Sequence, residues 1–342
     1  MRREIAEQAE GVAATLEKVR RQAERLQSAM SGRRHILFVA RGSSDNAAIY
    51  GRYLVETHLG IQASLAAPSV ATHYRARLDL SDALVVSVSQ SGRTEEIVEV
   101  QRWAATLGAA TVAVSNDADS PLAFEADVPL TTQAGSERAV PATKSYTAQL
   151  AALAGLAATL GDGEDLWPLL DRVPTEVTRL ESAEDGVAGA VDVLAASEDV
   201  LVTGRGLVFG TALEIGLKLE ETCLQPVRGL SYADLRHGPI AVVGPGLTAV
   251  VVAAPDGPML EPIIELAGDL TQRGARVLAV GGEARLAAAA AYHVPGPDLP
   301  EAVAPIGLIV PAQLVVESLA RRLGLDPDAP RGLSKVTTTD PR

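Results

Sequence analysis

Residues 36–56 read ILFVARGSSDNAAIYGRYLVE, and residues 200–220 repeat the pattern as VLVTGRGLVFGTALEIGLKLE. In both segments an apolar run is followed by an Arg-Gly pair, Arg41-Gly42 in the first and Arg205-Gly206 in the second. A helix-like stretch follows each pair. An apolar run without alternation, a turn and a helix are typical of a βα unit whose strand is covered on both faces. The repeated segment therefore predicts an α/β protein.

The repeat extends beyond these two segments. Three further segments of the first half recur in the second half, in the same order and about 164–166 residues later. They are ALVVSVSQSG (83–92) as AVVVAAPDGP (249–258), GAATVAVSN (108–116) as GARVLAVGG (274–282), and TAQL (147–150) as PAQL (311–314). Four matches in order at a nearly constant offset predict a duplicated α/β domain.

Apolar runs bounded by Gly, Ser or Asn predict strands at 36–40, 84–88, 111–114, 200–203, 248–253 and 276–280. Strands that alternate with helices indicate βαβ units and a parallel sheet. Residues 2–30 carry apolar side chains at spacings of three and four, which predicts one amphipathic helix. We therefore expect an N-terminal helix over 1–30, a first domain over 31–165, a second domain over 190–325 and a tail over 326–342.

The composition limits the partners of this chain. Asp and Glu number 43 against 30 Lys and Arg, and a net charge of −13 disfavours binding to nucleic acid and anionic membranes. Cys223 is the single cysteine, which excludes a disulfide framework and a cysteine metal cluster. The charged first residues do not resemble a signal peptide, and the apolar stretch around 148–160 is short for a membrane span. We therefore expect a soluble cytoplasmic protein.

Hydroxyl groups gather after two of the predicted strands. SQSGRT (89–94) follows the strand over 84–88 and precedes a helix that begins with Glu95-Glu96. A helix N-terminus with hydroxyl donors can hold a phosphate, although Ser91 or Thr94 could equally be an ordinary N-cap. Gly42-Ser43-Ser44 is a second turn of this kind, and turns at the carboxyl ends of neighbouring strands can converge on one ligand. The second copy has PDGP (255–258) instead, so we expect anion binding only in the first domain.

Three charged residues lie on one face of the predicted helix after Gly206. Glu214, Lys218 and Glu221 are spaced i, i+4, i+7. They form either a surface ladder of ion pairs or a site in which one carboxylate is a general base held by its neighbours.

Two further residues are candidates for chemistry. His237 lies in DLRHGP (234–239), between an arginine and a Gly-Pro turn, which suits a fixed imidazole, although a loop histidine is more often inert. Lys335 follows the proline-rich segment 327–332, which predicts an extended tail. A tail lysine is usually solvated, and it can instead fold over a pocket as an amine nucleophile.

Five motifs in order resemble the tandem sugar isomerase (SIS) family, which includes the isomerase half of glucosamine-6-phosphate synthase. They are SVSQSGRTEEIVE (87–99), ERAVPATKSYTAQL (137–150), GRG with ALEIGLKLEETC (204–223), DLRHGP (234–239) and PRGLSK (330–335). The resemblance covers residues from about 30 to 336. It implies two tandem flavodoxin-like domains, each a three-layer αβα sandwich with a parallel sheet, in a homodimer that needs no metal or organic cofactor.

The resemblance also implies a role for each candidate in a phosphosugar site. Glu221 would be the base that moves a proton between C1 and C2, and Lys218 would support it. His237 would assist ring opening from the partner subunit, and Lys335 would cover the sugar from the tail. Val140 would lie near C1 and C2. The phosphate would be held by Ser44, Ser89, Gln90, Ser91 and Thr94.

Two departures from the synthase pattern shape the expected reaction. We find no glutamine-hydrolysing domain in this chain, so glutamine-dependent synthesis would need a separate subunit to supply ammonia. Pro141-Ala142 follows Val140, where the synthases have a serine two residues after the valine. Stand-alone relatives include aminosugar-phosphate deaminases. We therefore expect an isomerase/deaminase that converts glucosamine 6-phosphate, or a close relative, to fructose 6-phosphate and ammonia through an enolamine.

Two alternatives use the same residues differently. Abstraction of the C2 proton of N-acetylglucosamine 6-phosphate, followed by loss of the C3 hydroxyl, would make the protein a dehydratase, with Ala142 leaving room for the acetamido group. A sugar-phosphate sensor would bind without turnover, and it would have no need for both Glu221 and Lys335. The sequence leaves open the sugar epimer, the N-substituent and any oligomeric state beyond a dimer.

Overall fold

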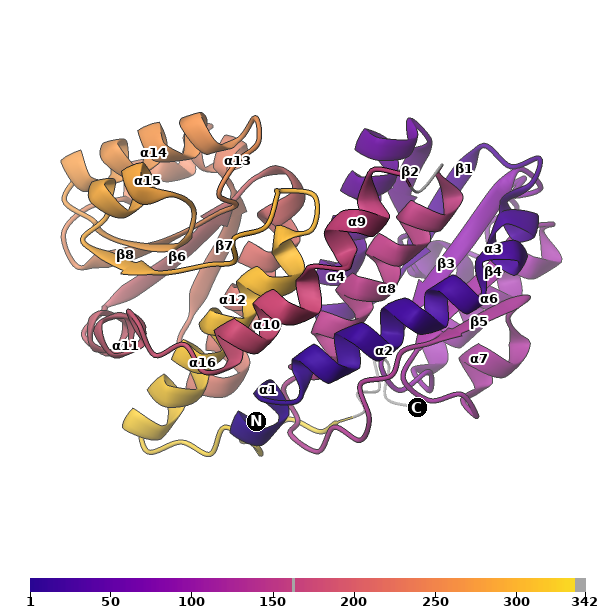
Figure 1. Ribbon diagram of the computed structural model, residues 1–342, viewed down its shortest axis with the longest axis horizontal. Coiled ribbons are helices and arrows are strands. Elements are labelled where there is room, and N and C mark those ends of the chain that lie inside the picture. Colours follow the sequence, from indigo (N-terminus) through magenta and orange to yellow (C-terminus); the bar gives the residue numbers. More distant parts are fainter. Residues whose placement is uncertain (162–163, 336–342) are drawn as a thin grey trace. The chain divides into compact units, whose positions relative to one another are not determined.

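The protein is described by a computed structural model that covers residues 1–161 and 164–335 (Figure 1). The chain forms two compact units. The first unit contains Glu10–Glu137, Lys144–Asp171 and, from the tail, Ser334-Lys335. The second unit contains Met1–Ala9, Arg138–Thr143 and Arg172–Leu333. Each unit is built on its own sheet.

The sheet of the first unit has five parallel strands in the order β2-β1-β3-β4-β5. Helices α3, α4 and α8 cover one face of this sheet, and α5, α6 and α7 cover the other (Figure 1). Strands β3 and β4 are therefore buried along their whole length. The strands are β1 (His35–Val39), β2 (Gln62–Leu65), β3 (Ala83–Val88), β4 (Ala110–Ser115) and β5 (Val128–Thr131). The helices are α2 (Gln8–Arg21), α3 (Ala23–Met30), α4 (Ser43–Leu54), α5 (Ser69–Thr72), α6 (Glu95–Thr106), α7 (Pro121–Glu125), α8 (Lys144–Leu160) and α9 (Leu166–Leu170).

The sheet of the second unit has the order β10-β9-β8-β6-β7, again with parallel pairs. Read through the sequence repeat, this is the strand order of the first sheet. Helices α11, α12 and α16 cover one face, and α14 and α15 cover the other (Figure 1). The strands are β6 (Asp199–Gly204), β7 (Val227–Ser231), β8 (Leu247–Ala253), β9 (Arg276–Gly281) and β10 (Tyr292–Val294). The helices are α1 (Arg2–Ile5), α10 (Val173–Glu181), α11 (Val187–Ala195), α12 (Phe209–Cys223), α13 (Tyr232–Arg236), α14 (Leu260–Gln272), α15 (Ala284–Ala289) and α16 (Ala304–Arg322).

The predicted α/β class is confirmed, and all six predicted strands lie in the inner strands of the two sheets. The four strands that the sequence did not reveal are the edge strands β2, β5, β7 and β10. Their sequences, QASL, VPLT, VRGLS and YHV, lack a continuous apolar run. An edge strand pairs on one side only and is less buried, so its sequence carries a weaker pattern.

The prediction of one continuous helix over 2–30 is wrong. The segment forms α1, α2 and α3, with breaks at residues 6–7 and at Gln22. Of the expected apolar stripe, Val12, Leu16, Val19 and Leu26 are buried, and Ala23 and Met30 are half-buried. Glu4 and Ile5 of α1 are also buried, and they belong to the second unit, whereas α3 belongs to the first. The segment thus passes from one unit to the other, and the local spacing of apolar residues does not predict such a passage.

Helix α16 is long and apolar enough to cross a membrane by length and composition, a property that the sequence analysis missed. In the structure, 89% of its apolar window is buried inside the protein. It contacts α10, α11 and α12. Helix α16 is thus the core helix of the second unit.

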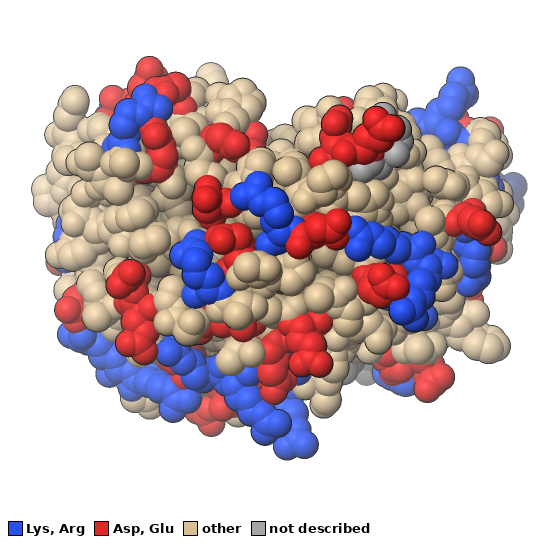
Figure 2. All heavy atoms as spheres, in the orientation of Figure 1, with Lys and Arg blue, Asp and Glu red and all other residues tan. Residues whose placement is uncertain are grey.

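Charged side chains of both signs are interspersed on the face drawn in Figure 2. Several described surface residues form ion pairs, such as Arg93 with Asp117 at 2.7 Å. Exposed pairs of this kind contribute little to stability, so burial of apolar side chains carries most of the folding free energy.

The role of α16 predicts unequal effects of two leucine truncations. Leu308 is fully buried, whereas Leu323 at the end of the helix is 40% exposed. We expect Leu308→Ala to lower the free energy of unfolding by about 2–5 kcal/mol because it leaves a cavity, and Leu323→Ala by less than about 0.5 kcal/mol. Urea unfolding followed by circular dichroism measures both. Equal losses would contradict the assignment of α16 as the core.

Candidate functional site

The strand order of the first sheet reverses between β1 and β3. Crossover connections leave these two neighbouring strands toward opposite faces, which opens a crevice at their carboxyl ends. Strands β1 and β3 are paired up to Val39 and Ser87. The turn at residues 42–44 follows β1, and the loop at residues 89–94 follows β3. The two hydroxyl-rich turns therefore leave the sheet side by side.

Ser44 is held in place from the helix behind it. It lies in the first turn of α4 and is 8% exposed. Its Oγ accepts a hydrogen bond from Nε2 of Gln149, a buried residue of α8, at 3.0 Å. This bond fixes the orientation of the hydroxyl at the crevice.

The loop over residues 89–94 is tied to β4 by its backbone. The Ser89 N–H donates to the Val114 carbonyl, and the Gln90 carbonyl accepts from the Asn116 N–H, each at 3.0 Å. Gly92 has a φ of +60°, and a Cβ at this position would lie 2.1 Å from Ser120 Oγ. The turn therefore requires glycine for both conformation and space.

The side chains of this loop do not cap α6. Thr94 is the N-cap residue, as the capping alternative expected, but it makes no side-chain cap hydrogen bond. Its Oγ1 lies 3.5 Å from Ser89 Oγ. Ser91 Oγ accepts a hydrogen bond from the Arg93 N–H within the loop, at 3.2 Å. Ordinary capping therefore does not explain the hydroxyls of residues 89–94.

The arginine that follows β1 forms an ion pair. Arg41 binds Glu96, in the first turn of α6, through two hydrogen bonds of 3.0 Å. Such a bidentate pair is well defined in geometry. It links the segment after β1 to the helix that follows the loop over 89–94.

The charged face of α12 is buried rather than exposed. Glu214 and Lys218 are 0% and 1% exposed, so the surface-ladder alternative is wrong for them. Lys218 Nζ lies 3.5 Å from Glu214 Oε1 and forms an ion pair with Glu221 Oε2. The Glu221 side chain is 27% exposed. Lys218 therefore lies between a fully buried carboxylate, Glu214, and a partly exposed one, Glu221. Glu221 can reach solvent or a ligand.

His237 has a different environment from the other candidates. It follows α13, where its backbone N–H donates to the carbonyls of Ala233 and Asp234. Its side chain is exposed, and the imidazole makes no hydrogen bond with any residue that the structure describes. The backbone of His237 is thus held in place, whereas no hydrogen bond among the described residues orients its ring.

Lys335 binds a buried carboxylate that the sequence analysis did not identify. Lys335 Nζ donates to Glu137 Oε2 at 2.6 Å. Glu137 also accepts from the Ser145 N–H at 3.0 Å and from Ser145 Oγ at 2.7 Å, at the start of α8. Burial would raise the pKa of Glu137, but the Lys335 ammonium and the Ser145 hydrogen bonds outweigh it and hold the pKa below its usual value. The one available signal was its place in the motif ERAVPATKSYTAQL.

Val140 lies in a short segment that we call the strap, residues 138–143. The strap belongs to the second unit, whereas the residues on both sides of it belong to the first. It forms no helix or strand. Its Val140 N–H donates to the Asp328 carbonyl at 2.9 Å. The strap therefore takes its conformation from residues distant in sequence.

The second sheet carries carboxylates at the equivalent point between β6 and β8. A Cβ on Gly257 would lie 2.1 Å from Glu301 Oε2, and a Cβ on Gly206 would lie 3.3 Å from Glu301 Oε1. Asp256 Oδ1 accepts a hydrogen bond from the Glu301 N–H at 2.7 Å. Burial, together with the charge of Asp256, raises the pKa of Glu301 to about 7. The second copy thus has acidic side chains where the first has hydroxyls.

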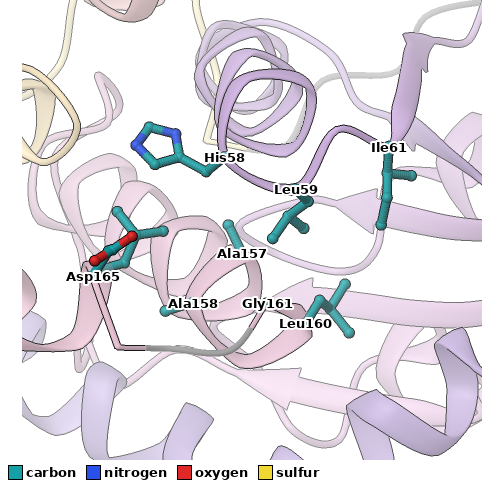
Figure 3. Close-up of a pocket in the computed structure, with 9 residues that line it drawn as sticks. His58, Leu59, Ile61, Ala157, Ala158, Leu160, Gly161 and Asp165 are labelled. Carbon is teal, nitrogen blue, oxygen red and sulfur yellow. The ribbon is translucent and has the colours of Figure 1, made fainter.

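A pocket of about 210 Å³ lies elsewhere in the first unit (Figure 3). His58, Leu59 and Ile61 line it from the segment before β2, and Ala157 and Leu160 line it from the end of α8 (Figure 3). Residues that precede a strand lie at the amino edge of a parallel sheet. This pocket is therefore separate from the crevice at the carboxyl edge.

Known proteins resemble this chain over the first domain and over most of its length. Residues 29–159 match the SIS domain model. The chain is 34% identical over 308 residues to a glutamine–fructose-6-phosphate aminotransferase (isomerizing) of Methanothermobacter thermautotrophicus. That match covers 89% of this chain and 52% of the relative, so the chain spans about half the length of this curated protein.

Solved structures match over nearly the whole chain. A chain from Silicibacter pomeroyi assigned to the phosphosugar isomerases superposes with a TM-score of 0.87 at 33% identity, covering 96% of this chain and 99% of that one. The glucosamine-6-phosphate deaminase of Thermotoga maritima superposes with a TM-score of 0.73 at 25% identity, covering 95% of this chain and 99% of that one. The flavodoxin-like strand order expected for both sheets is confirmed in this chain, and these solved chains of similar extent share its fold.

The Glu137–Lys335 pair predicts a pH-dependent stability difference. A lowered carboxyl pKa adds stability that is fully present above the ordinary value of 4.5 and is lost as the pH falls through the lowered pKa. We expect Glu137→Gln to reduce the free energy of unfolding by about 1.5–3 kcal/mol at pH 7, and the difference from wild type to shrink below pH 4.5. Denaturant unfolding from pH 7 to pH 3 measures it. Glu99→Gln, at an exposed position of α6, is the control. A difference that stays constant over this range would contradict the pairing.

Proposed function

The chain belongs to the SIS domain family of phosphosugar isomerases, and on that premise we propose that it is an aminosugar-6-phosphate isomerase/deaminase. Its substrate is glucosamine 6-phosphate or a close relative, and its products are fructose 6-phosphate and ammonia. The observation that carries the proposal is the buried Lys218 between Glu214 and the partly exposed Glu221. A buried ion triad with one accessible carboxylate is costly for stability alone and suits a positioned base.

Phosphate binding is assigned to the first domain, residues 31–165. Ser44 and the loop over 89–94 offer hydroxyl and amide groups at the start of α6, a 12-residue helix with a favourable N-terminal dipole. Gln149 fixes one of these hydroxyls. Such a local donor set can hold a dianion on a chain whose net charge is −13. The binding residues in this proposal are Ser44, Ser89, Gln90, Ser91 and Thr94.

The second domain, residues 190–325, supplies the base. After ring opening, Glu221 removes the proton from C2 while the O1 oxygen gains one, which yields an enolamine. Return of a proton to C1 produces an imine at C2. Water adds to this carbon and ammonia leaves, which yields fructose 6-phosphate. The Lys218 ammonium keeps the Glu221 carboxylate in position throughout. These steps need proton transfer and water alone.

Two segments complete the site in this proposal. Lys335 of the tail, 326–342, lies over the sugar, and Glu137 keeps its ammonium in one place. Val140 of the strap lies near C1 and C2, with Pro141-Ala142 beside it. Ala142 has no hydroxyl at the reacting end of the sugar, so the substituent at C1 or C2 can differ from that in the synthases, and the proposal therefore includes close relatives of glucosamine 6-phosphate. Deaminase chemistry is also supported by the extent of the T. maritima deaminase, of which this chain covers 99%.

The proposal includes a homodimer in the cytoplasm. His237 is exposed and has no side-chain hydrogen bond within the described chain. An imidazole presented in this way is available to a second copy, where it would assist ring opening. Each active site would then contain Glu221 of one subunit and His237 of the other.

Substitution of the base predicts loss of C2 proton exchange. We expect wild-type protein in D2O to exchange the C2 proton of glucosamine 6-phosphate and release ammonia, and Glu221→Gln to be slower by at least about 100-fold. Proton NMR with an ammonia assay measures both. Glu220→Gln changes the exposed neighbour on α12 and should keep wild-type rates. No ammonia from any hexosamine 6-phosphate would refute the deaminase. An unsaturated product from N-acetylglucosamine 6-phosphate alone would favour the dehydratase.

The shared site predicts complementation between two inactive variants. We expect Glu221→Gln and His237→Ala each to be inactive alone. After dissociation, mixing and reassociation, activity should return to about a quarter of wild type, because half of the random dimers are mixed and each mixed dimer has one intact site of two. Absence of any recovery, with mixed dimers verified by native mass spectrometry, would mean that both residues act within one subunit.

A further inference from the structure

The strap, residues 138–143, has no internal secondary structure to define its shape. A segment of this kind is fixed by the partners of its backbone groups. Two partners lie far along the chain. The Val140 N–H donates to the Asp328 carbonyl at 2.9 Å, and the Thr143 carbonyl accepts from Gln313 Nε2 at 3.4 Å. These bonds hold the later part of the strap.

The Glu4 side chain binds the backbone at the beginning of the strap. The Arg138 N–H donates to Glu4 Oε1. The Ala139 N–H lies 3.3 Å from Oε1 and 3.4 Å from Oε2 of the same carboxylate. Ala139 is 2% exposed and Glu4 is 7% exposed, so water does not readily replace these bonds.

A buried carboxylate on a four-residue helix calls for an explanation. Helix α1 contacts α16, and Ile5 already supplies it with a fully buried apolar anchor. A second apolar residue at position 4 would serve packing without the cost of desolvating a charge. The carboxylate is matched instead to two consecutive backbone N–H groups of the strap, and its Oε2 also lies 3.8 Å from the Met1 ammonium. Charge-assisted bonds of this type restrict the backbone more strongly than neutral ones.

We infer that Glu4 is a positioning residue for the sugar-facing strap: it fixes residues 138–139 and thereby places Val140 and the adjoining Pro141-Ala142. The inference rests on the proposed function, in which Val140 lies near C1 and C2 of the sugar. The segment before the first domain is then part of the substrate-binding apparatus, although it touches no substrate atom. Loss of the carboxylate loosens the strap and misplaces the reacting carbons relative to the base.

The first test measures the strap directly, without substrate. Hydrogen–deuterium exchange of a peptide that spans 137–144 is compared in wild type, Glu4→Ala, Glu4→Gln and Glu10→Ala. We expect faster exchange in Glu4→Ala and an intermediate rate in Glu4→Gln, which keeps an acceptor oxygen. Glu10 is exposed at the start of the first unit, and its variant should match wild type. Unchanged exchange in Glu4→Ala would overturn the inference. Glu4→Gln is the folded reference if Glu4→Ala does not fold.

The second test asks whether the strap matters for the sugar. We expect kcat/KM for glucosamine 6-phosphate to fall by about 10- to 100-fold in Glu4→Ala, with a smaller fall in Glu4→Gln. The affinity for inorganic phosphate should stay within about 2-fold of wild type in both variants, because the loop over 89–94 is untouched. Faster strap exchange with unchanged kcat/KM would leave Glu4 a structural residue and overturn its positioning role.

The outcomes separate this inference from the proposed function. If wild type binds glucosamine 6-phosphate without releasing ammonia, the deaminase is wrong, and the Glu4 variants are judged by calorimetric affinity for glucosamine 6-phosphate instead. A weakened affinity for the sugar phosphate with preserved phosphate affinity would then support the positioning role. If wild type binds no sugar phosphate, the proposed function and the inference fall together.

Discussion

A parallel sheet brings the carboxyl ends of all its strands to one edge, and the rest of the site depends on this constraint. In the order β2-β1-β3-β4-β5, the connections leave β1 and β3 toward opposite faces, and ligands of open α/β sheets bind at such a point. The turn at 42–44 and the loop at 89–94 occupy that point. The second sheet has the same order and therefore the same point of reversal, between β6 and β8. There the chain places Asp256 and Glu301, which explains how two copies of one fold differ in chemistry.

Buried charge is the second theme of the molecule. Lys218 lies between two carboxylates of its own helix, and Glu137 is compensated by Lys335 and by the start of α8. Isolated, each of these charges would destabilise the fold. In pairs they define geometry, because a desolvated ion has few alternative positions. Both clusters contain residues to which the family resemblance gives a catalytic role, and stability alone would be served as well by apolar side chains.

The strap depends both on buried charge and on the division of the chain into two units. Its residues belong to the second unit, while Glu137 before it and Lys144 after it belong to the first. The backbone of such a crossing segment needs partners from elsewhere, and Glu4, Gln313 and Asp328 provide them. The N-terminal segment, the last helix and the tail thus converge on six residues. Conformation at Val140 is consequently a property of the whole second unit.

The sequence by itself determined the α/β class, the duplication and the six inner strands, because buried parallel strands and βα turns leave local apolar patterns. It also placed Ser44 and residues 89–94 at strand ends, and the five motifs identified the family. Other features depend on contacts between residues distant in sequence, so only the tertiary structure decided them. They are the breaks in the helix over 2–30, the edge strands, the burial of Glu214 and Lys218, and the partners of Lys335 and of the strap. A helix face with charged residues has the same sequence pattern whether water or protein covers it. Glu137 and Glu4 were missed for the same reason, since a carboxylate acquires its role only when folding brings its donors to it.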